Sequence, residues 1–347
     1  MGRFALLVAV LVGLALGAVA PALGDTTEFY AIAYDTALGR SSDTELDVFL
    51  PPSGPAEASL VFYAPQGYGV TVGQPAGTKV GAVAADVTTG GSTTAIEADG
   101  DLVTDDPAKY VGNTCAPGVH AAVFVANLTA SGITVAVPLY VDPTSGADTA
   151  LGSFKIQACL ASPDVPAAMG GAPGGLRLIE ADLDFTTVFT NPAATGNYTW
   201  KVFETPFTPG TTTPNPAAAV EARSIVGLPK LFSLKWALNA KKTGATFGGK
   251  VTEGGKARAG VNVRFLASQK KTGPWAAFGV AKTKADGSFT FTKTFTGSLY
   301  VFAHVNPYIS DSCSVAGSTA PGGCVFESTG PSFGPILHVT VPKVKKK

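Results

Sequence analysis

The sequence predicts an all-β protein made of two β-sandwich domains. Glycine and proline are abundant, with 41 and 25 of the 347 residues, while only 14% of the residues are charged. No long stretch shows the 3.6-residue period of an amphipathic helix. Short apolar stretches with a period of two recur instead, as in Phe232 to Leu238, separated by turn residues. Because successive side chains of a strand point to opposite faces, this pattern indicates many short strands packed into sheets.

Residues 1–24 have the features of a secretory signal peptide and are not expected to join the fold. Arg3 is the only charge, Phe4 to Ala20 is an apolar run, and small residues at Ala22 and Gly24 supply a cleavage site. The alternative is a retained membrane anchor, since 17 apolar residues lie at the lower limit for spanning a bilayer. Pro21 interrupts the run and favours cleavage. We therefore expect a secreted or cell-surface protein with no transmembrane segment after cleavage.

A segment rich in Pro, Thr and Ala from Pro206 to Ala222 divides the chain into halves of opposite charge. Residues 25–222 carry 21 Asp and Glu against 6 Lys and Arg, whereas residues 223–347 carry 4 acids against 18 bases. The segment has almost no apolar periodicity. We therefore expect an acidic β-sandwich domain over 25–207, a linker over 208–222 and a basic Ig-like β-sandwich domain over 223–347.

The acidic half contains nine or ten candidate strands, among them Phe29 to Tyr34, Leu46 to Leu50 and the continuously apolar Val119 to Leu128. Residues 164–175 are rich in Gly, Ala and Pro and are expected to form a loop.

Two groups of carboxylates in this half are candidates for chemistry. Glu97, Asp99 and Asp101 recur at every second residue, and oxygen ligands of this kind could bind calcium; a solvated acidic loop is the alternative. Glu180, Asp182 and Asp184 also alternate, with apolar residues between them, which indicates the outer face of a half-buried strand. A glycoside hydrolase would need two such carboxylates facing each other across a cleft.

Four cysteines in an exported chain favour disulfide bonds over metal binding or redox chemistry. Three pairings are open, and the simplest joins Cys115 to Cys159 and Cys313 to Cys324, within each half.

Turn motifs in the basic half resemble those of a known family. Gly249-Lys250-Val251-Thr252, Gly260-Val261-Asn262-Val263 and the segment from Thr283 to Phe289 are similar to the bacterial Ig-like modules of the carboxypeptidase regulatory-like type. The resemblance covers about residues 250–295 and does not extend to the acidic half. It implies a small β-sandwich without catalysis of its own, appended to a secreted or surface protein. The Asp286-Gly287 pair is typical of a type I′ hairpin turn.

The excess of bases predicts a polyanionic partner, either an anionic cell-envelope polymer or a polysaccharide; no nucleic acid is expected for an exported chain. The candidate binding residues are the paired and terminal lysines of the basic half: Lys241, Lys242, Lys270, Lys271, Lys282, Lys284, Lys345, Lys346 and Lys347.

No catalytic motif accompanies these features, and an enzyme is not expected. The three histidines stand alone in apolar stretches. Trp275 follows a Gly-Pro pair, so it is either packed at a turn or exposed to stack on a sugar. We therefore expect a non-enzymatic binding or structural protein whose basic module adheres to anionic polymers. The alternatives are two oppositely charged halves that dock on each other, a glycan hydrolase in the acidic half, and a carbohydrate-binding module centred on Trp275.

Overall fold

The computed structural model describes residues 27–342 except 37, 90, 91, 93, 131, 229, 232, 233, 254, 255, 306, 307, 313–324, 330 and 331. The expected signal peptide and the three C-terminal lysines therefore lie outside the described residues. The structure confirms the all-β prediction: it contains 24 strands and, among the described residues, only 3-10 helices of at most five residues. Among the described residues, no helix has the length and apolar character needed to cross a membrane.

Twelve strands in the first 228 residues form most of one large sheet. They are β1 (Glu28–Ala33), β2 (Ser41–Phe49), β3 (Glu57–Ala64), β4 (Gly69–Val70), β5 (Lys79–Thr89), β6 (Ile96–Asp105), β7 (Ala122–Ala130), β8 (Ile133–Pro143), β9 (Phe154–Cys159), β10 (Leu176–Thr190), β11 (Gly196–Pro206) and β12 (Val220–Leu228). The short 3-10 helices η1 (Pro107–Tyr110), η2 (Gly146–Ala150), η3 (Ala167–Met169), η4 (Pro173–Gly175) and η5 (Pro216–Ala218) lie in its loops.

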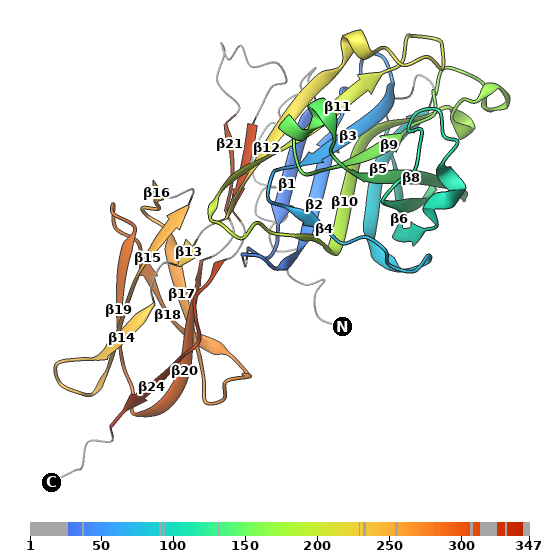
Figure 1. Ribbon diagram of the computed structural model, residues 1–347. Helices are drawn as coiled ribbons and strands as arrows, with labels where there is room; N and C mark the ends of the chain where they lie inside the picture. The colour runs from blue at the N-terminus through green and yellow to red at the C-terminus, as the bar shows by residue number, and fades with distance from the viewer. Residues whose placement is uncertain are drawn as a thin grey trace.

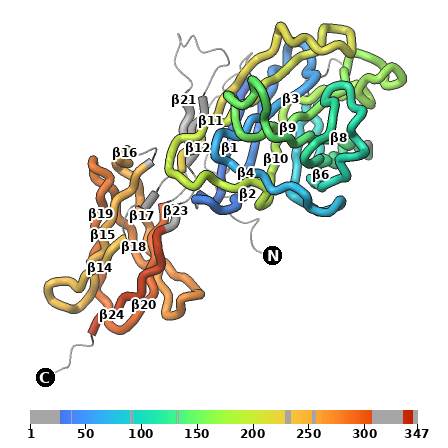
Figure 2. Tube along the Cα trace, viewed as in Figure 1, coloured from blue at the N-terminus to red at the C-terminus, as the bar shows by residue number. Residues whose placement is uncertain are grey.

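This sheet curls until its two ends meet. The strand order is β1-β2-β10-β5-β6-β7-β8-β9-β3-β11-β12, and neighbouring strands are antiparallel. Although β1 and β12 stand far apart in that order, the backbone N–H of Ala31 donates to Oγ of Ser224 at 2.9 Å. Figures 1 and 2 show β1 beside β12, followed to the right by β2 and β10. The nearly closed sheet encloses one apolar core.

Alternating side chains explain why these strands form that core. In β2, Ser42, Thr44, Leu46 and Val48 are buried, while the residues between them face outward. Aromatic side chains fill the interior: Phe29, Phe62, Phe124, Phe185, Phe189 and Trp200 are all fully buried. The rings of Phe189 and Trp200 meet edge to face with centroids 5.2 Å apart. Burial of each such side chain stabilises the fold by about 2–3 kcal/mol, and Trp200 is the largest of the fully buried side chains among the described residues.

The segment expected as an interdomain linker joins two neighbouring strands of this one sheet. Residues 196–204 of β11 pair with residues 220–228 of β12, and Phe207 N–H donates to Ala56 O at 2.7 Å. Prolines break the strand pattern between the two, but they do not end the domain. The unit built on this sheet, which we call the first body, therefore extends through Leu228. The expected linker over residues 208–222, with a second domain starting at residue 223, was wrong.

The second body is a sandwich of two small sheets. One contains β13 (Lys230–Leu231), β14 (Lys235–Leu238), β15 (Gly244–Glu253), β16 (Lys256–Ala257) and β19 (Ser288–Thr294); the other contains β17 (Asn262–Ser268), β18 (Ala276–Lys282), β20 (Gly297–Val305), β23 (Ser332–Phe333) and β24 (Leu337–Val341). The core between them includes Phe247, Phe265, Phe289 and Val301, all at most 1% exposed. Trp236 packs against this core, as its position in the alternating pattern predicts.

The chain returns once from the second body to the first. β21 (Tyr308–Ser312) and β22 (Val325–Thr329) pair with each other, and β22 lies parallel to β12 over residues 223–227. The edge of β12 would otherwise present unpaired backbone groups, and β22 covers them. The chain thus links the two bodies in two ways: it passes directly from one to the other after Leu228, and it later returns so that β21 and β22 join the large sheet.

The Asp286-Gly287 turn also differs from the prediction. It carries the chain from β18 in one sheet to β19 in the other, so it does not close a hairpin. Gly287 has a left-handed φ of +76°, whereas Asp286 does not, and a type I′ turn needs both. The Asp286 carboxylate accepts hydrogen bonds from the N–H and the hydroxyl of Ser288, which holds the corner in place.

Candidate functional site

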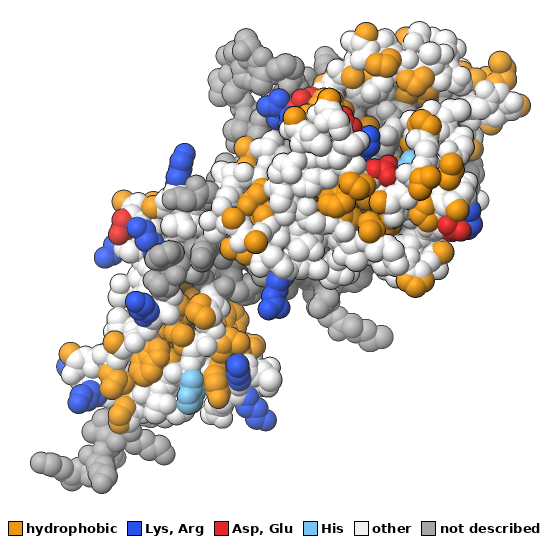
Figure 3. All heavy atoms as spheres, in the orientation of Figure 1, with side chains coloured by type: hydrophobic (Ala, Val, Ile, Leu, Met, Phe, Trp, Pro, Cys, Tyr) orange, Lys and Arg blue, Asp and Glu red, His pale blue; other side chains and the backbone are white. Residues whose placement is uncertain are grey.

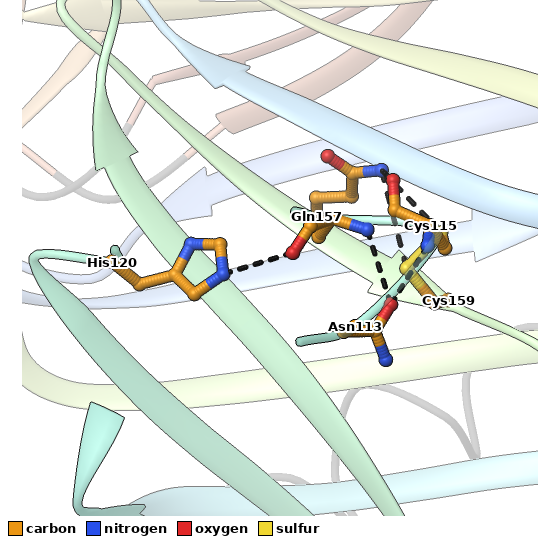
Figure 4. The surroundings of a disulfide bond; sticks show 6 residues. Asn113, Cys115, His120, Gln157 and Cys159 are labelled. Atoms are coloured by element: carbon orange, nitrogen blue, oxygen red, sulfur yellow. Dashed lines mark hydrogen bonds between the residues drawn. A yellow bond between two sulfur atoms is a disulfide. The ribbon is translucent and has the colours of Figure 1, made fainter. Parts of the chain in front are cut away.

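One of the two expected disulfides is present and fixes a polar loop onto the large sheet. Cys115 and Cys159 are bonded, and Gln157 donates to the carbonyl of Cys115 at 3.1 Å (Figure 4). Asn113 accepts from the backbone N–H of Cys115 at 2.8 Å. Cys313 and Cys324 lie outside the described residues.

His120 lies next to this loop, and both of its ring nitrogens lie within hydrogen-bonding distance of an oxygen atom. Its Nδ1 lies 2.9 Å from Oδ2 of Asp142, and its Nε2 lies 3.1 Å from the carbonyl of Ala116 (Figure 4). The ring also contacts Tyr140, with centroids 4.6 Å apart. Each ring nitrogen thus faces an oxygen acceptor, and the ring links the loop at Ala116 to Asp142 on β8.

The expected calcium ligands do not converge. Glu97, Asp99 and Asp101 all lie on β6 and point outward from it, since Ala98 and Leu102 between and beside them are buried. Asp101 pairs instead with Lys79, at 2.5 Å. Among the described residues, no group of three or more His, Cys, Asp or Glu side chains could hold a metal ion. Alternate residues of a strand point to one face but are spaced along it, so the carboxylates at residues 97, 99 and 101 do not surround a single point. The prediction of a calcium site from this spacing was therefore wrong.

These carboxylates belong to a larger acidic face on the outside of β2, β10, β5 and β6. In the register, Asp182 lies opposite Asp47, and Asp184 lies opposite Glu45. The members of the face are Glu45, Asp47, Asp86, Glu97, Asp99, Asp101, Glu180, Asp182 and Asp184. The alternation predicted for residues 180–184 as the outer face of a strand is confirmed by the buried Ala181 and Leu183.

Burial and crowding on the acidic face raise the pKa of some of its carboxyl groups. Burial, with the charges of Glu180 and Asp182, raises the pKa of Asp47 to about 9. Burial and the neighbouring Glu45 raise the pKa of Asp182 to about 7. Asp182 also lines a hollow of about 340 Å³, together with Asp86, Glu97, Glu180, Ala84 and Ala85.

The structure distributes the described candidate lysines between the two ends of the second body. Lys241 and Lys242 precede β15, and Lys270 and Lys271 follow β17, at the end where β19 runs into β20. Lys282, the last residue of β18, and Lys284, between β18 and β19, lie at the opposite end. Figure 3 shows Lys and Arg side chains scattered around this body. The six described lysines therefore do not form one continuous patch.

The corrected boundary nevertheless concentrates positive charge on the second body. Its described residues, within 230–305 and 332–342, include 13 Lys and Arg against two acids, Glu253 and Asp286. The other two acids of the C-terminal half, Asp311 and Glu327, lie on β21 and β22 of the large sheet. Among the side chains that the structure describes, no salt bridge joins one body to the other.

The second body also carries an aromatic surface that sequence analysis identified only in part. Val301, Ala303 and Val305 of β20 are buried, so Tyr300, Phe302 and His304 face outward from the same strand. Trp275 meets Phe302 edge to face with centroids 4.7 Å apart, and His338 of β24 stacks on Tyr300 at 4.7 Å.

We call this surface the aromatic face; it comprises Trp275, Tyr300, Phe302, His304 and His338 and lies on the outside of β17, β18, β20 and β24. Trp275 is half-buried: its ring lies edge to face with that of Phe302, and part of its side chain remains exposed. In Figure 3, hydrophobic side chains gather on this body with a histidine among them.

Bases border the aromatic face. Arg264 of β17 lies opposite His304 in the register and opposite Val280 of β18. Lys282 follows two residues after Val280 and points to the same side, because Ala281 between them is buried. Alternation along β17 and β20 could have identified these residues, but only the pairing of β17 with β20 brings them onto one surface.

No protein-family model matches this chain, and no curated protein is significantly similar to it.

Proposed function

We propose that the second body binds an anionic polysaccharide of the cell envelope, as the non-enzymatic module of a secreted or cell-surface protein. The observation that carries the proposal is the aromatic face with Arg264 and Lys282 at its border. Half-exposed rings gathered on one side of a small domain mark a binding surface. Flat rings present apolar faces to the C–H groups of sugars, while guanidinium and ammonium groups attract carboxylate or phosphate substituents.

The dimensions of the face fit a short stretch of polymer. Residues 300 to 304 of β20 span roughly 13 Å at about 3.3 Å per residue, which accommodates two or three sugar units. The scattered lysines at both ends of the body add a long-range attraction that is independent of ring contacts. Such attraction is screened by salt over a Debye length of about 8 Å at physiological ionic strength.

The test measures binding of the full chain from Asp25 to a polyuronate and to a neutral glucan of equal length, at rising salt. We expect binding to the polyuronate to weaken steeply between about 0.05 and 1 M salt, with residual binding from ring stacking. Trp275→Ala should remove that residual binding. Retention that is equal for both polymers, or unchanged at high salt, would contradict the proposal.

The acidic face supports a second candidate function, glycan hydrolysis. Asp182, whose pKa burial raises to about 7, lies beside Glu180 and Asp86 at a hollow of about 340 Å³. A carboxyl group that keeps its proton near neutral pH has the property required of a general acid. Release of reducing ends from the polyuronate, abolished by Asp182→Asn, would favour this candidate over simple binding. If the unmodified protein releases none, the candidate is discarded.

A further inference from the structure

An apolar cavity opens at one end of the large curled sheet, in the first body and away from the aromatic face. Its volume is about 180 Å³. A second hollow of about 50 Å³ adjoins it toward the core, and the two share Leu128, Val137, Leu160 and Leu178 as walls. The side chains lining the deeper hollow are all apolar. The pair therefore forms one apolar space that runs from the end of the sheet into its interior.

Small residues leave this space unfilled. Six alanines line the outer cavity: Ala56, Ala98, Ala130, Ala136, Ala161 and Ala172. The larger side chains around it, including Leu128, Leu160 and Leu178, are only half-buried, whereas the leucines of the closed core are at most a few per cent exposed. Protein interiors are normally close-packed, and an apolar cavity of roughly 150 Å³ stays dry and binds a molecule such as benzene. A space of this size thus suits a compact hydrocarbon group.

Two polar groups stand at the rim of the cavity with unused hydrogen-bonding capacity. Glu57 is 3% exposed and lines the cavity, and its Oε1 has no hydrogen-bond partner among the described residues. Arg177 also lines the cavity, and its Nε likewise has no acceptor among the described residues. Buried polar atoms without partners destabilise a protein, so a bound molecule that satisfied them would gain affinity.

The surrounding loop holds the arginine so that Nε stays available. Nη1 donates to the carbonyl of Gly54 at 3.0 Å, and Nη2 donates to the carbonyls of Pro51 at 2.9 Å and Pro55 at 3.2 Å. Nη2 also lies 3.8 Å from Oε1 of Glu57. The guanidinium is therefore anchored by both terminal nitrogens, while its Nε–H and Oε1 of Glu57 have no partner among the described residues.

A hydroxyl group satisfies both atoms at once. Its oxygen can accept from Nε–H of Arg177 while its hydrogen is donated to Oε1 of Glu57. Burial and the charge of Glu204 raise the pKa of Glu57 to about 8, so an uncharged head group suits the site better than a second carboxylate.

We propose that this cavity binds a small apolar alcohol, with its hydrocarbon part between the half-buried leucines and its hydroxyl between Glu57 and Arg177. The site is separate from the polysaccharide surface and does not rest on it.

The experiment titrates the full chain from Asp25 with 1-alkanols from hexanol to dodecanol by calorimetry. Each added CH₂ should strengthen binding about fourfold, the equivalent of about 0.8 kcal/mol per buried CH₂, until the cavity is full, after which affinity should level off. An alkyl methyl ether with the same number of heavy atoms as octanol should bind more weakly, since it has no hydrogen to donate to Glu57. No binding, or affinity that rises through the whole series without levelling, would overturn the proposal.

Matched variants separate the cavity from surface adsorption. Ala98→Leu places a larger side chain into the space from β6 and should reduce octanol affinity at least tenfold. Ala82→Leu makes the same change at an exposed position of the neighbouring strand β5 and should leave affinity unchanged. Should Ala98→Leu fail to fold, Ala172→Leu tests the same space from the 164–175 loop. Octanol binding that survives in a folded filling variant refutes the site.

The head group is tested by Glu57→Met, which removes the acceptor and keeps a side chain of similar length. This variant should lose the preference for octanol over the ether while it binds the ether as before. An undiminished preference would show that Glu57 does not receive the hydroxyl.

Discussion

The backbone N–H of Ala31 donates to Oγ of Ser224, 193 residues further along the chain. Ser224 is fully buried. This hydrogen bond lies where the two ends of the curled sheet meet, so it helps to close the first body around its core. It also places residues on the C-terminal side of the Pro-rich segment firmly within that body.

Replacement of Ser224 by Ala should lower the free energy of unfolding by about 1–2 kcal/mol, because a buried N–H loses an acceptor. Chemical denaturation followed by tryptophan fluorescence measures the change, since Trp200 lies in the same core. Ser298→Ala serves as the control: it removes an exposed hydroxyl contact with Thr340 and should cost less than 0.5 kcal/mol. Equal effects of the two substitutions would argue against closure at Ser224.

The disulfide between Cys115 and Cys159 should contribute about 4 kcal/mol, given the 44 residues that separate its cysteines. A double Cys→Ser variant should therefore melt at a lower temperature than the oxidised protein. The same loss should follow mild reduction of the unmodified protein. A variant that melts at the unchanged temperature would show that the loop is held by its hydrogen bonds alone.

The acidic face should make the protein less stable as pH rises from about 5 to 9. The pKa of Asp47 is raised to about 9, so over this range the folded state keeps a proton that the unfolded state releases. Stability from this group is present below its ordinary pKa and is lost as pH approaches 9. Asp47→Asn should flatten the dependence and stabilise the protein by about 1 kcal/mol at pH 8, after allowance for screening by water.

Thermal melts across this pH range test the effect, with Asp99→Asn as the control. Asp99 lies on the same face but is exposed, so its substitution should leave the slope unchanged. A rise in stability between pH 5 and 8 in the unmodified protein would contradict the prediction.

Gly100 should not tolerate a side chain. A Cβ atom at this position of β6 would lie 1.7 Å from the carbonyl oxygen of Asn127 on β7. Gly100→Ala should therefore force the two strands apart and destabilise the protein by at least about 2 kcal/mol. Gly112→Ala is the matched control, because a Cβ there meets no atom within 4 Å. Comparable melting temperatures for the two variants would show that β6 and β7 can separate without cost.

Polyuronate binding should depend on the position of the Lys and Arg side chains on the second body as well as on their number. Arg264→Ala with Lys282→Ala should weaken polyuronate binding about fivefold at 0.15 M salt, the equivalent of about 1 kcal/mol. Lys235→Ala with Lys256→Ala removes the same charge from exposed positions of the other sheet and should weaken binding less. If both pairs weaken binding equally, the attraction arises from net charge and the aromatic face has no special role.

Much of the strand content could be predicted from local sequence. The alternation of Leu46 and Val48 with charged residues identified β2, and the alternation around Asp182 identified the outer face of β10. Such patterns are set by the two-residue period of a strand, which any short segment expresses by itself.

The sequence by itself thus determined the all-β class, the inward or outward direction of most side chains and the opposite charges of the two halves. Only the tertiary structure decided that β12 lies beyond the Pro-rich segment yet belongs to the first sheet, that Trp275 meets Phe302, and that alanines from separate strands leave a cavity beside Glu57. The physical reason is that strand pairing joins backbone groups distant in sequence. Which edges pair, and which side chains then become neighbours, depends on how the whole core packs.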